Sequence, residues 1–465
     1  MYLKNFSKAW ASQGLFLLLI FILVHLSACQ LPQDWQPGLA STKAPSGIPA
    51  TLPSPSLEPS LTSLPPTATP LPSSTPTPPP TATPIPPSPT PESLILWTSE
   101  QEQALATIRA LVEEYNGQAP LKVQVLNRKA DTLRTDLLAA KLAGANLPDL
   151  IWGNQNDLAG LLFDEQLQPL NLPEGTTGFL SAALTGATFN GQLWGLPLTV
   201  QDFLFLYFNR ALVSTPPQTT DELIVTSRAE REGQPNGLVA AWFEARWLLA
   251  WLNGFGGLPT SPDGLQPTLD TPQMVQALNL LHELYLAAPP ETQTLAEGRN
   301  LFASGKVAMA LDGDWARQSY LSFSPTIQVG IAPLPLAVST GRLAGSAVGG
   351  SYLLYQRNIP QGKQAAVVNF TQYLASPAIQ LRLAQALGRL PALRAALASP
   401  QLAGDPSLTA AVAQAESSIG LPPTKGLRCA LAGINAHLPA FLTSSLDAQN
   451  TATAMQETAA NCLAK

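Results

Sequence analysis

The stretch "SLILWTSEQEQALATIRALVEEYNGQAPLKVQVLNRKADTLRTDLLAAKLAGANLPDLIWG", residues 93–153, decides the fold. Three short apolar segments (93–97, 121–125 and 148–153) have the length and composition of buried strands. Between them, apolar residues recur at helical spacing, which predicts two helices. Strand, helix, strand, helix and strand in this order predict an α/β fold with parallel strand pairing.

Downstream, the chain keeps this character and becomes increasingly helical. Long helical patterns cover 240–257 and 271–288, and the last hundred residues are rich in Ala and Leu. About 370 residues follow position 92, which is more than one hydrophobic core usually serves. We therefore expect two lobes, and a site between lobes is the default location for a ligand.

Upstream, residues 29–92 differ sharply from the rest of the chain. Of the 45 prolines, 18 fall between Pro45 and Pro91, among Ser, Thr, Ala and Leu. Such a segment favours polyproline II, an extended and semi-rigid form without a core, at about 3.1 Å per residue. We expect a surface linker over 29–92 that spans on the order of 100 Å or more.

The N-terminus has the pattern of an export signal. Two lysines precede a short apolar run, 15–26, which ends in "LSAC", residues 26–29. The run is too short for a final membrane span but suits a signal peptide. Small residues before a cysteine resemble the bacterial lipobox, so we expect removal of residues 1–28 and lipidation of Cys29. A signal-anchor helix with an incidental cysteine is the alternative.

Composition narrows the classes of function. Charged residues make up 12% of the chain and the formal net charge is −6, so we expect no nucleic-acid partner, since phosphate binding needs a basic surface. The histidines are His25, His282 and His437. His282-Glu283 begins like a zinc-binding helix, but Leu286 stands where the second histidine would be. We expect no metal, no cofactor and no histidine-based catalysis, whereas the many carboxylates leave glycoside hydrolysis open.

Tryptophan stands out in the folded part. Indole rings stack on the apolar faces of sugars, while carboxylates and amides bond to the hydroxyl groups. Trp247 and Trp251 lie one helical turn apart in an apolar stretch, which favours core packing. Trp152 and Trp315 stand next to glycine and polar residues, in settings typical of loops, which makes them candidates for ligand stacking.

Five segments, in order, resemble motifs of extracellular sugar-binding proteins. They are "NLPDLIWGNQNDLAGLLFDEQLQPL" (146–170), "GATFNGQLWGLPLTVQDFLFLYFNRALV" (186–213), "LFASGKVAMALDGDWA" (301–316), "GGSYLLYQRNIPQGKQAAVVNFTQYLASPAIQ" (349–380) and "LPPTKGLRCALAGINAHLPAFL" (421–442). Each motif alone is weak, but the ordered set covers nearly everything after the linker. The chain resembles a maltose- or multiple-sugar-type substrate-binding lipoprotein of an ABC importer.

The resemblance implies an architecture and a role. The fold would be periplasmic-binding-protein-like, with two α/β lobes joined by hinge strands around an interlobe ligand cleft. Residues 93–465 would form this solute-binding domain, with lobe one at about 93–202 and 345–391 and lobe two at about 203–344 and 392–465. The implied function is a non-enzymatic, monomeric receptor, lipid-anchored at the outer face of the cytoplasmic membrane. It would capture a small solute, a carbohydrate above all, for the permease subunits of an ABC importer.

The resemblance also implies ligand contacts. The matching positions offer acceptors for hydroxyl groups or faces for sugar rings, and they are Trp152, Asn154, Asp157, Asp202, Glu244 and Trp315. Asp202 would lie on the hinge side, and Trp315, in "GDW", falls on the family's stacking tryptophan. Arg246 departs from the maltose-type pattern, which has an aromatic residue there. The departure argues against a maltose-like ligand and would suit a more polar or acidic one.

Two other classes of function stay open. A surface enzyme that acts on glycosides would form product from a sugar, whereas a receptor would bind it without turnover. A sensory or structural surface protein with the same fold would have no permease partner, and its deletion would leave uptake intact.

Cys429 and Cys462 remain once Cys29 is lipidated. They form an even pair on the exported side of a membrane, where disulfides persist, and they flank the closing helical region. We expect a structural disulfide between them. Two separate buried thiols are the alternative.

Overall fold

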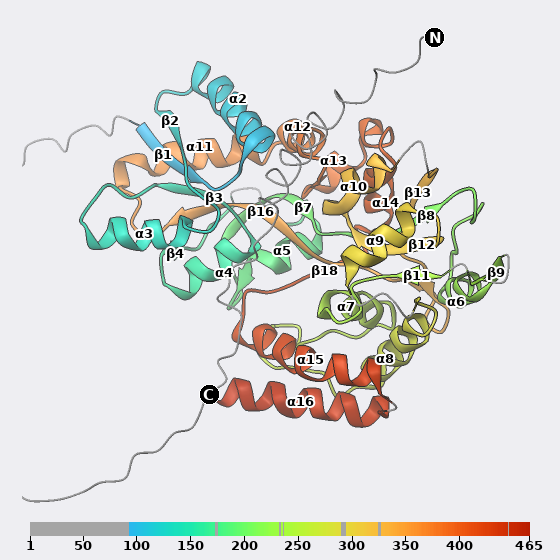
Figure 1. Ribbon diagram of the computed structural model, residues 1–465. Helices are drawn as coiled ribbons and strands as arrows, with labels where there is room; N and C mark the ends of the chain where they lie inside the picture. The colour runs from blue at the N-terminus through green and yellow to red at the C-terminus, as the bar shows by residue number, and fades with distance from the viewer. Residues whose placement is uncertain are drawn as a thin grey trace, which may run out of the picture. The chain divides into compact units, whose positions relative to one another are not determined.

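The computed structural model describes residues 93–465 except 173–174, 232–233, 236, 290–293, 324–326 and 445. The predicted signal peptide, Cys29 and the linker lie outside the described residues. The described part has the predicted two-lobed α/β fold, with an eight-stranded sheet and a four-stranded sheet (Figure 1). No helix in the described part is long and apolar enough to cross a membrane.

The eight-stranded sheet contains both parallel and antiparallel pairs. Its path runs β17-β7-β16-β3-β1-β2, and β4 and β18 also pair with β16. The strands are β1 (Ser93–Thr98), β2 (Lys122–Asn127), β3 (Leu150–Asn154), β4 (Leu167–Gln168), β7 (Gly195–Gln201), β16 (Ala347–Gln356), β17 (Leu390–Pro391) and β18 (Ile419–Gly420). β1 lies parallel to β2 and β3, which confirms the pairing predicted from the opening stretch, and β16 is antiparallel to β3 and β7.

Helices lie on both sides of this sheet (Figure 1). One group is α2 (Glu102–Gln118), α11 (Gln364–Leu374) and α12 (Pro377–Leu387), and the other is α3 (Leu133–Leu142), α4 (Gln155–Phe163) and α5 (Ser181–Ala187). The predicted apolar face of α2 is buried, and its Tyr115 meets Phe370 of α11 edge-on, with 4.9 Å between ring centroids. Packing of this face, more than helix propensity, stabilises such helices.

The four-stranded sheet has the order β11-β12-β8-β13. Its strands are β8 (Leu204–Asn209), β11 (Leu238–Val239), β12 (Met309–Gly313) and β13 (Val329–Ala332), and the helices around it are α7 (Ala245–Gly254), α8 (Pro272–Tyr285), α9 (Leu295–Ala303) and α14 (Pro406–Gln414). Trp247 and Trp251 of α7 are buried, as predicted, and belong to the core of this lobe.

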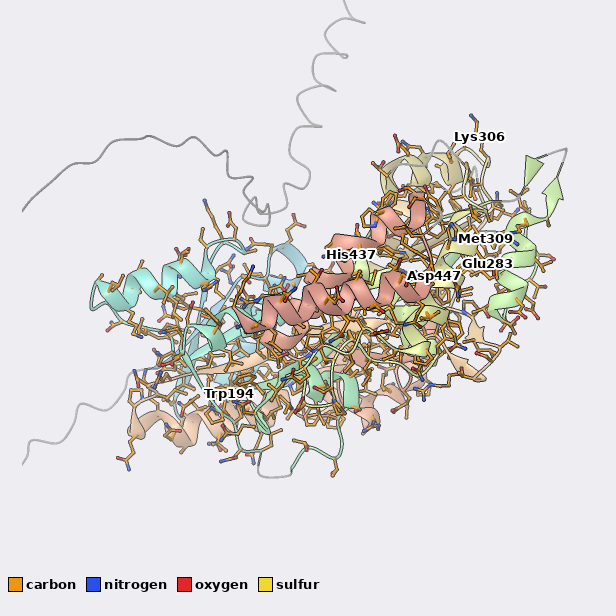
Figure 2. All side chains as sticks on the ribbon, turned by 90° about the horizontal axis from the view of Figure 1, so that it is seen from below. Trp194, Glu283, Lys306, Met309, His437 and Asp447 are labelled. Carbon is orange, nitrogen blue, oxygen red and sulfur yellow. A yellow bond between two sulfur atoms is a disulfide. The ribbon has the colours of Figure 1, made fainter. Side chains whose placement is uncertain are left out.

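Two long helices, α15 (Lys425–Thr443) and α16 (Ala448–Ala464), end the chain and pack side by side. Figure 2 labels His437 on α15 and Asp447, which caps α16; His437 Nε2 lies 2.8 Å from Thr458 Oγ1 of α16. A disulfide joins Cys429 of α15 to Cys462 of α16, with 5.4 Å between their Cα atoms. The predicted bridge is confirmed, and it fastens the last helix to its neighbour.

The chain passes between the sheets at short connections that lie close together. The first crossing, Asp202 and Phe203, links β7 to β8, and the second crossing, 344–346, leads into β16. The amide of Leu204 donates to Ser346 Oγ at 2.8 Å, which ties the two crossings to each other. The exact lobe boundaries given above stay a prediction.

The remaining elements are short. They are β5 (Thr188–Phe189), β6 (Gln192–Leu193), α6 (Thr220–Arg228), β9 (Glu230–Arg231), β10 (Gln234–Pro235), the 3-10 turn η2 (Asp314–Ala316), α10 (Arg317–Ser322), β14 (Leu336–Ala337), β15 (Arg342–Leu343), η3 (Gln361–Lys363), α13 (Arg394–Leu397) and η4 (Pro400–Leu402). Of these, η2 matters most here, because it carries Trp315.

Candidate ligand-binding site

In both sheets, strands end close to the first crossing. In the eight-stranded sheet, β7 ends there, and Asn154 at the end of β3 pairs with Ser351 of the same neighbouring strand, β16. In the four-stranded sheet, Gly313 at the end of β12 pairs with Leu204 at the start of β8. Ligands of α/β sheets bind outside the carboxyl ends of strands. The side chains around the first crossing are therefore the candidates for the ligand-binding site.

Trp315 is the exposed aromatic residue at this position. It follows β12 directly, and 48% of its surface is exposed, whereas Trp247 is 1% exposed. The indole lies against Gly313, where an added Cβ would come within 2.3 Å of the ring, so this close approach requires glycine. Trp247 meets the indole edge-on, with 6.4 Å between ring centroids. An exposed indole held in this way offers a surface on which a sugar ring can stack.

Arg246 and Asp202 form an ion pair beside the indole. Arg246 Nη1 lies 3.7 Å from Asp202 Oδ2 and donates to the carbonyl of Ala347 at 3.1 Å. The guanidinium also lies over the Trp315 ring, 5.4 Å from its centroid. The carboxylate of Asp202 already balances the charge of Arg246. The presence of Arg246 is therefore a weaker reason to expect an acidic ligand than it was from the sequence alone.

Two more carboxylates stand near this ion pair. Glu244 occupies the N-cap position of α7. Partial burial raises the pKa of the Glu244 carboxyl, and the nearby Arg246 partly offsets this shift. Burial together with the neighbouring Asp202 raises the pKa of Asp314 to about 7. With Asp202, these groups make the surroundings of Trp315 rich in hydrogen-bond acceptors.

The candidate contact Trp152 has different surroundings from those predicted. Trp152 was expected in a loop, but it lies in β3 and its side chain is completely buried in the core. The run "DLIWG" is a central strand that is buried on both faces, and Trp152 faces one of the two cores, so it presents no surface for stacking. This corrects the prediction for Trp152.

Asn154 and Asp157 cap helix α4. Asn154 Oδ1 accepts from the amides of Asn156 (2.8 Å) and Asp157 (3.1 Å), and Asp157 Oδ2 accepts from the amide of Asn154 (2.9 Å). This capping box accounts for both acceptor groups, and burial raises the pKa of Asp157. Asn154 stays a candidate contact because it ends β3 and is partly exposed, while Asp157 is better explained as a structural residue.

Sequence reasoning missed a second ion pair at the edge of the eight-stranded sheet. Arg389 Nη1 donates to Glu100 Oε1 at 2.8 Å and to Ser351 Oγ at 2.9 Å. Glu100 follows β1 and Arg389 precedes β17, and their side chains are 18% and 21% exposed. No local motif connects residues 289 positions apart. The one signal in the sequence for this ion pair was the position of Glu100, close after a buried strand.

Other features of the described residues do not compete with this site. Within the described ranges, no three His, Cys, Asp or Glu side chains are grouped as a metal ion would require. Two neighbouring cavities of about 220 and 410 Å³ lie between α5 and the loop 258–265. Asp263 is the one charged residue that lines them, and no aromatic side chain does, so they lack the stacking surface that Trp315 offers.

A two-lobed α/β fold with acceptor groups and an exposed indole at the crossing between its sheets fits a protein that binds a polar solute. The model of the family described as bacterial extracellular solute-binding protein matches residues 110–410. The chain belongs to this family. The relatives that are similar to this chain are binding proteins and not enzymes.

Named relatives and solved structures agree with this assignment. The chain is 26% identical over 322 residues to the maltotriose-binding protein of Pyrococcus abyssi (strain GE5 / Orsay), covering 67% of this chain and 69% of that protein. It is 23% identical over 257 residues to the maltodextrin-binding protein MdxE of Bacillus subtilis (strain 168), covering 52% and 60% of the two chains.

The solved structures share the fold. A cyclo/maltodextrin-binding protein complexed with maltotetraose superposes with a TM-score of 0.71 at 20% identity, covering 81% of this chain and 98% of that chain. The cyclic α-maltosyl-1,6-maltose-binding protein of Arthrobacter globiformis gives a TM-score of 0.70 at 20% identity, covering 80% and 99%.

Proposed function

We propose that the chain is a lipid-anchored extracytoplasmic receptor that captures a maltodextrin-type oligosaccharide and delivers it to an ABC importer. The sugar class comes from the relatives, which are named as maltotriose-binding and maltodextrin-binding proteins. The sequence argued against such a ligand because Arg246 replaces an aromatic residue. The ion pair of Arg246 with Asp202 weakens that objection.

The observation that carries the proposal is the exposed indole of Trp315 among carboxylates. A glucosyl ring would stack on the indole, and its hydroxyl groups would donate to Asp202 and Glu244. These side chains flank the first crossing, so a ligand bound there can also contact the edge of the other sheet, at Asn154 or Glu100. Contacts to both lobes would favour a closed arrangement, because a ligand shifts an equilibrium only through its differential contacts.

The anchoring and delivery steps rest on different observations. The "LSAC" pattern at 26–29 supports lipidation of Cys29, and the proline-rich segment 29–92 would hold the binding domain away from the membrane. Membership of the solute-binding family supports handover to permease subunits.

Titration calorimetry tests the binding step. The protein is the mature chain, 29–465, with Cys29→Ser, titrated with maltose, maltotriose and maltotetraose and, for comparison, with cellotriose and glucuronate. We expect one site per chain, with maltotriose bound more tightly than cellotriose, and intact sugar recovered by chromatography afterwards. Hydrolysed sugar would instead favour the enzyme class, and the absence of heat with every maltodextrin would remove the proposed ligand.

A further inference from the structure

We propose that Asp314 is a positioning residue, which attaches the first crossing to the turn that carries Trp315 and so couples a ligand on Trp315 to the hinge. We call residues 313–315 the Trp315 turn. The identity of the ligand rests on the proposed function, whereas the attachment itself follows from hydrogen bonds within the chain.

Asp314 makes three hydrogen bonds to the two residues of the first crossing. Its Oδ2 accepts from the amides of Asp202 (2.9 Å) and Phe203 (3.2 Å). Its own amide donates to the carbonyl of Phe203 at 2.9 Å. Asp314 immediately precedes Trp315, so the stacking residue and the crossing are joined through one partly buried carboxyl group.

The crossing has a backbone conformation that needs such support. Asp202 has a φ of +71°, in the left-handed region that residues other than glycine seldom adopt. Conformations of this kind persist when the surroundings hold them, and they concentrate at functional sites. The bonds from Asp314 fix this conformation, and they also direct the Asp202 side chain toward β16, where an added Cβ on Gly349 would meet Oδ2 at 2.8 Å.

Arg246 adds a second connection on the other side of the indole. It donates to the carbonyl of Ala347, at the start of β16, and lies 3.5 Å from the carbonyl of Asp202. Arg246, which lies over the Trp315 ring, is thus bonded both to the first crossing and to the start of β16. We therefore expect the Trp315 turn to move together with the first crossing.

Three variants of the mature Cys29→Ser chain separate this role from general stability. Asp314→Ala removes the acceptor, and Asp314→Asn keeps it, because both amides bond to a single oxygen. Asp447→Ala is the matched control: Asp447 caps α16 by accepting from the amide of Asn450 at 2.9 Å, far along the chain from the crossing (Figure 2). Maltotriose affinity is measured by calorimetry and the radius of gyration by small-angle scattering, with and without maltotriose.

We expect Asp314→Ala to weaken maltotriose binding about tenfold or more, since two partly buried amides lose their acceptor. Its radius of gyration without ligand should differ from that of the wild type. Asp314→Asn should stay within about threefold of the wild-type affinity, and Asp447→Ala should leave affinity and scattering unchanged. Unchanged affinity and scattering in Asp314→Ala, or an Asn variant as weak as the Ala variant, would overturn the proposal.

Hydrogen exchange on the unmutated chain gives a measurement that does not depend on a variant folding. The amides of residues 202 and 203 should be protected even though they connect two strands, and exchange at the rate of open loops would refute the attachment. If the wild type binds no maltodextrin, the proposed function fails. The scattering difference and the protection would still decide the role of Asp314.

Discussion

At the scale of single residues, Trp315 has the most testable of the proposed ligand contacts. Trp315→Ala should weaken maltotriose binding by about 1–3 kcal/mol, because it removes the stacking surface. The melting temperature should change little, since the indole is half exposed. Titration calorimetry and thermal unfolding measure the two effects.

Trp251→Ala is the control for this experiment. Trp251 is 2% exposed in the core of its lobe, so its loss should destabilise the fold by about 3–5 kcal/mol. A Trp315→Ala protein that unfolds as readily as Trp251→Ala, yet binds sugar normally when folded, would show that Trp315 is a packing residue.

Asp314 should make the stability of the domain depend on pH. Burial and the neighbouring Asp202 raise its pKa to about 7, although the amides of Asp202 and Phe203 and the charge of Arg246 act in the opposite direction. The folded state therefore holds the proton more tightly than the unfolded state. The stabilisation is complete below pH 4 and is lost as the pH rises towards 7.

Asp314→Asn removes this titration and keeps the acceptor. The variant should match the wild type near pH 4 and exceed it at pH 8 in free energy of unfolding, by at most about 4 kcal/mol. Urea unfolding at several pH values measures the difference. Parallel pH profiles for the two proteins would argue against a proton on Asp314.

Residues near β3 and β1 show what single-residue reasoning could not supply. Trp152 and Trp315 both stand beside glycine and polar residues in the sequence, so composition did not distinguish them. Pairing of β3 with two neighbours buries Trp152, and the close approach to Gly313 leaves Trp315 outside. The pair of Glu100 with Arg389 depends on strands far apart in the chain, and no local pattern predicts it.

At the scale of elements, the disulfide between α15 and α16 fixes the end of the chain. Cys462→Ser should lower the free energy of unfolding by about 3–4 kcal/mol, because the bond closes a loop over 33 positions. Urea unfolding of the Cys29→Ser chain with and without this change gives the value. Two free thiols in the denatured, unreduced Cys29→Ser chain would contradict the bridge.

Long, periodic elements were predictable and short ones were not. The helical face of α2 and the strands β1 to β3 follow from periodicity, and so does the helix α3 between β2 and β3. The two-residue strands β17 and β18 carry no period of their own. They form because β7 and β16 offer edges to pair with.

At the scale of the whole molecule, the proposed N-terminal lipid would decide where the receptor acts. Cells that express the full chain and grow with labelled palmitate should incorporate label into the wild type and not into Cys29→Ser. The chemical reason is that the thiol of Cys29 would be the acceptor of the proposed lipid. Equal labelling of the two proteins would remove the anchor from this account, without bearing on the sugar site.

The crystal structure of the chain with maltotriose tests the central claim most directly, namely that the protein binds a maltodextrin at the first crossing. We predict a glucosyl ring stacked on Trp315, hydroxyl groups within hydrogen-bond distance of Asp202 and Glu244, and contacts from the edge of the eight-stranded sheet. Maltotriose bound in the cavities beside Asp263, or bound with Trp315 uncovered, would contradict it.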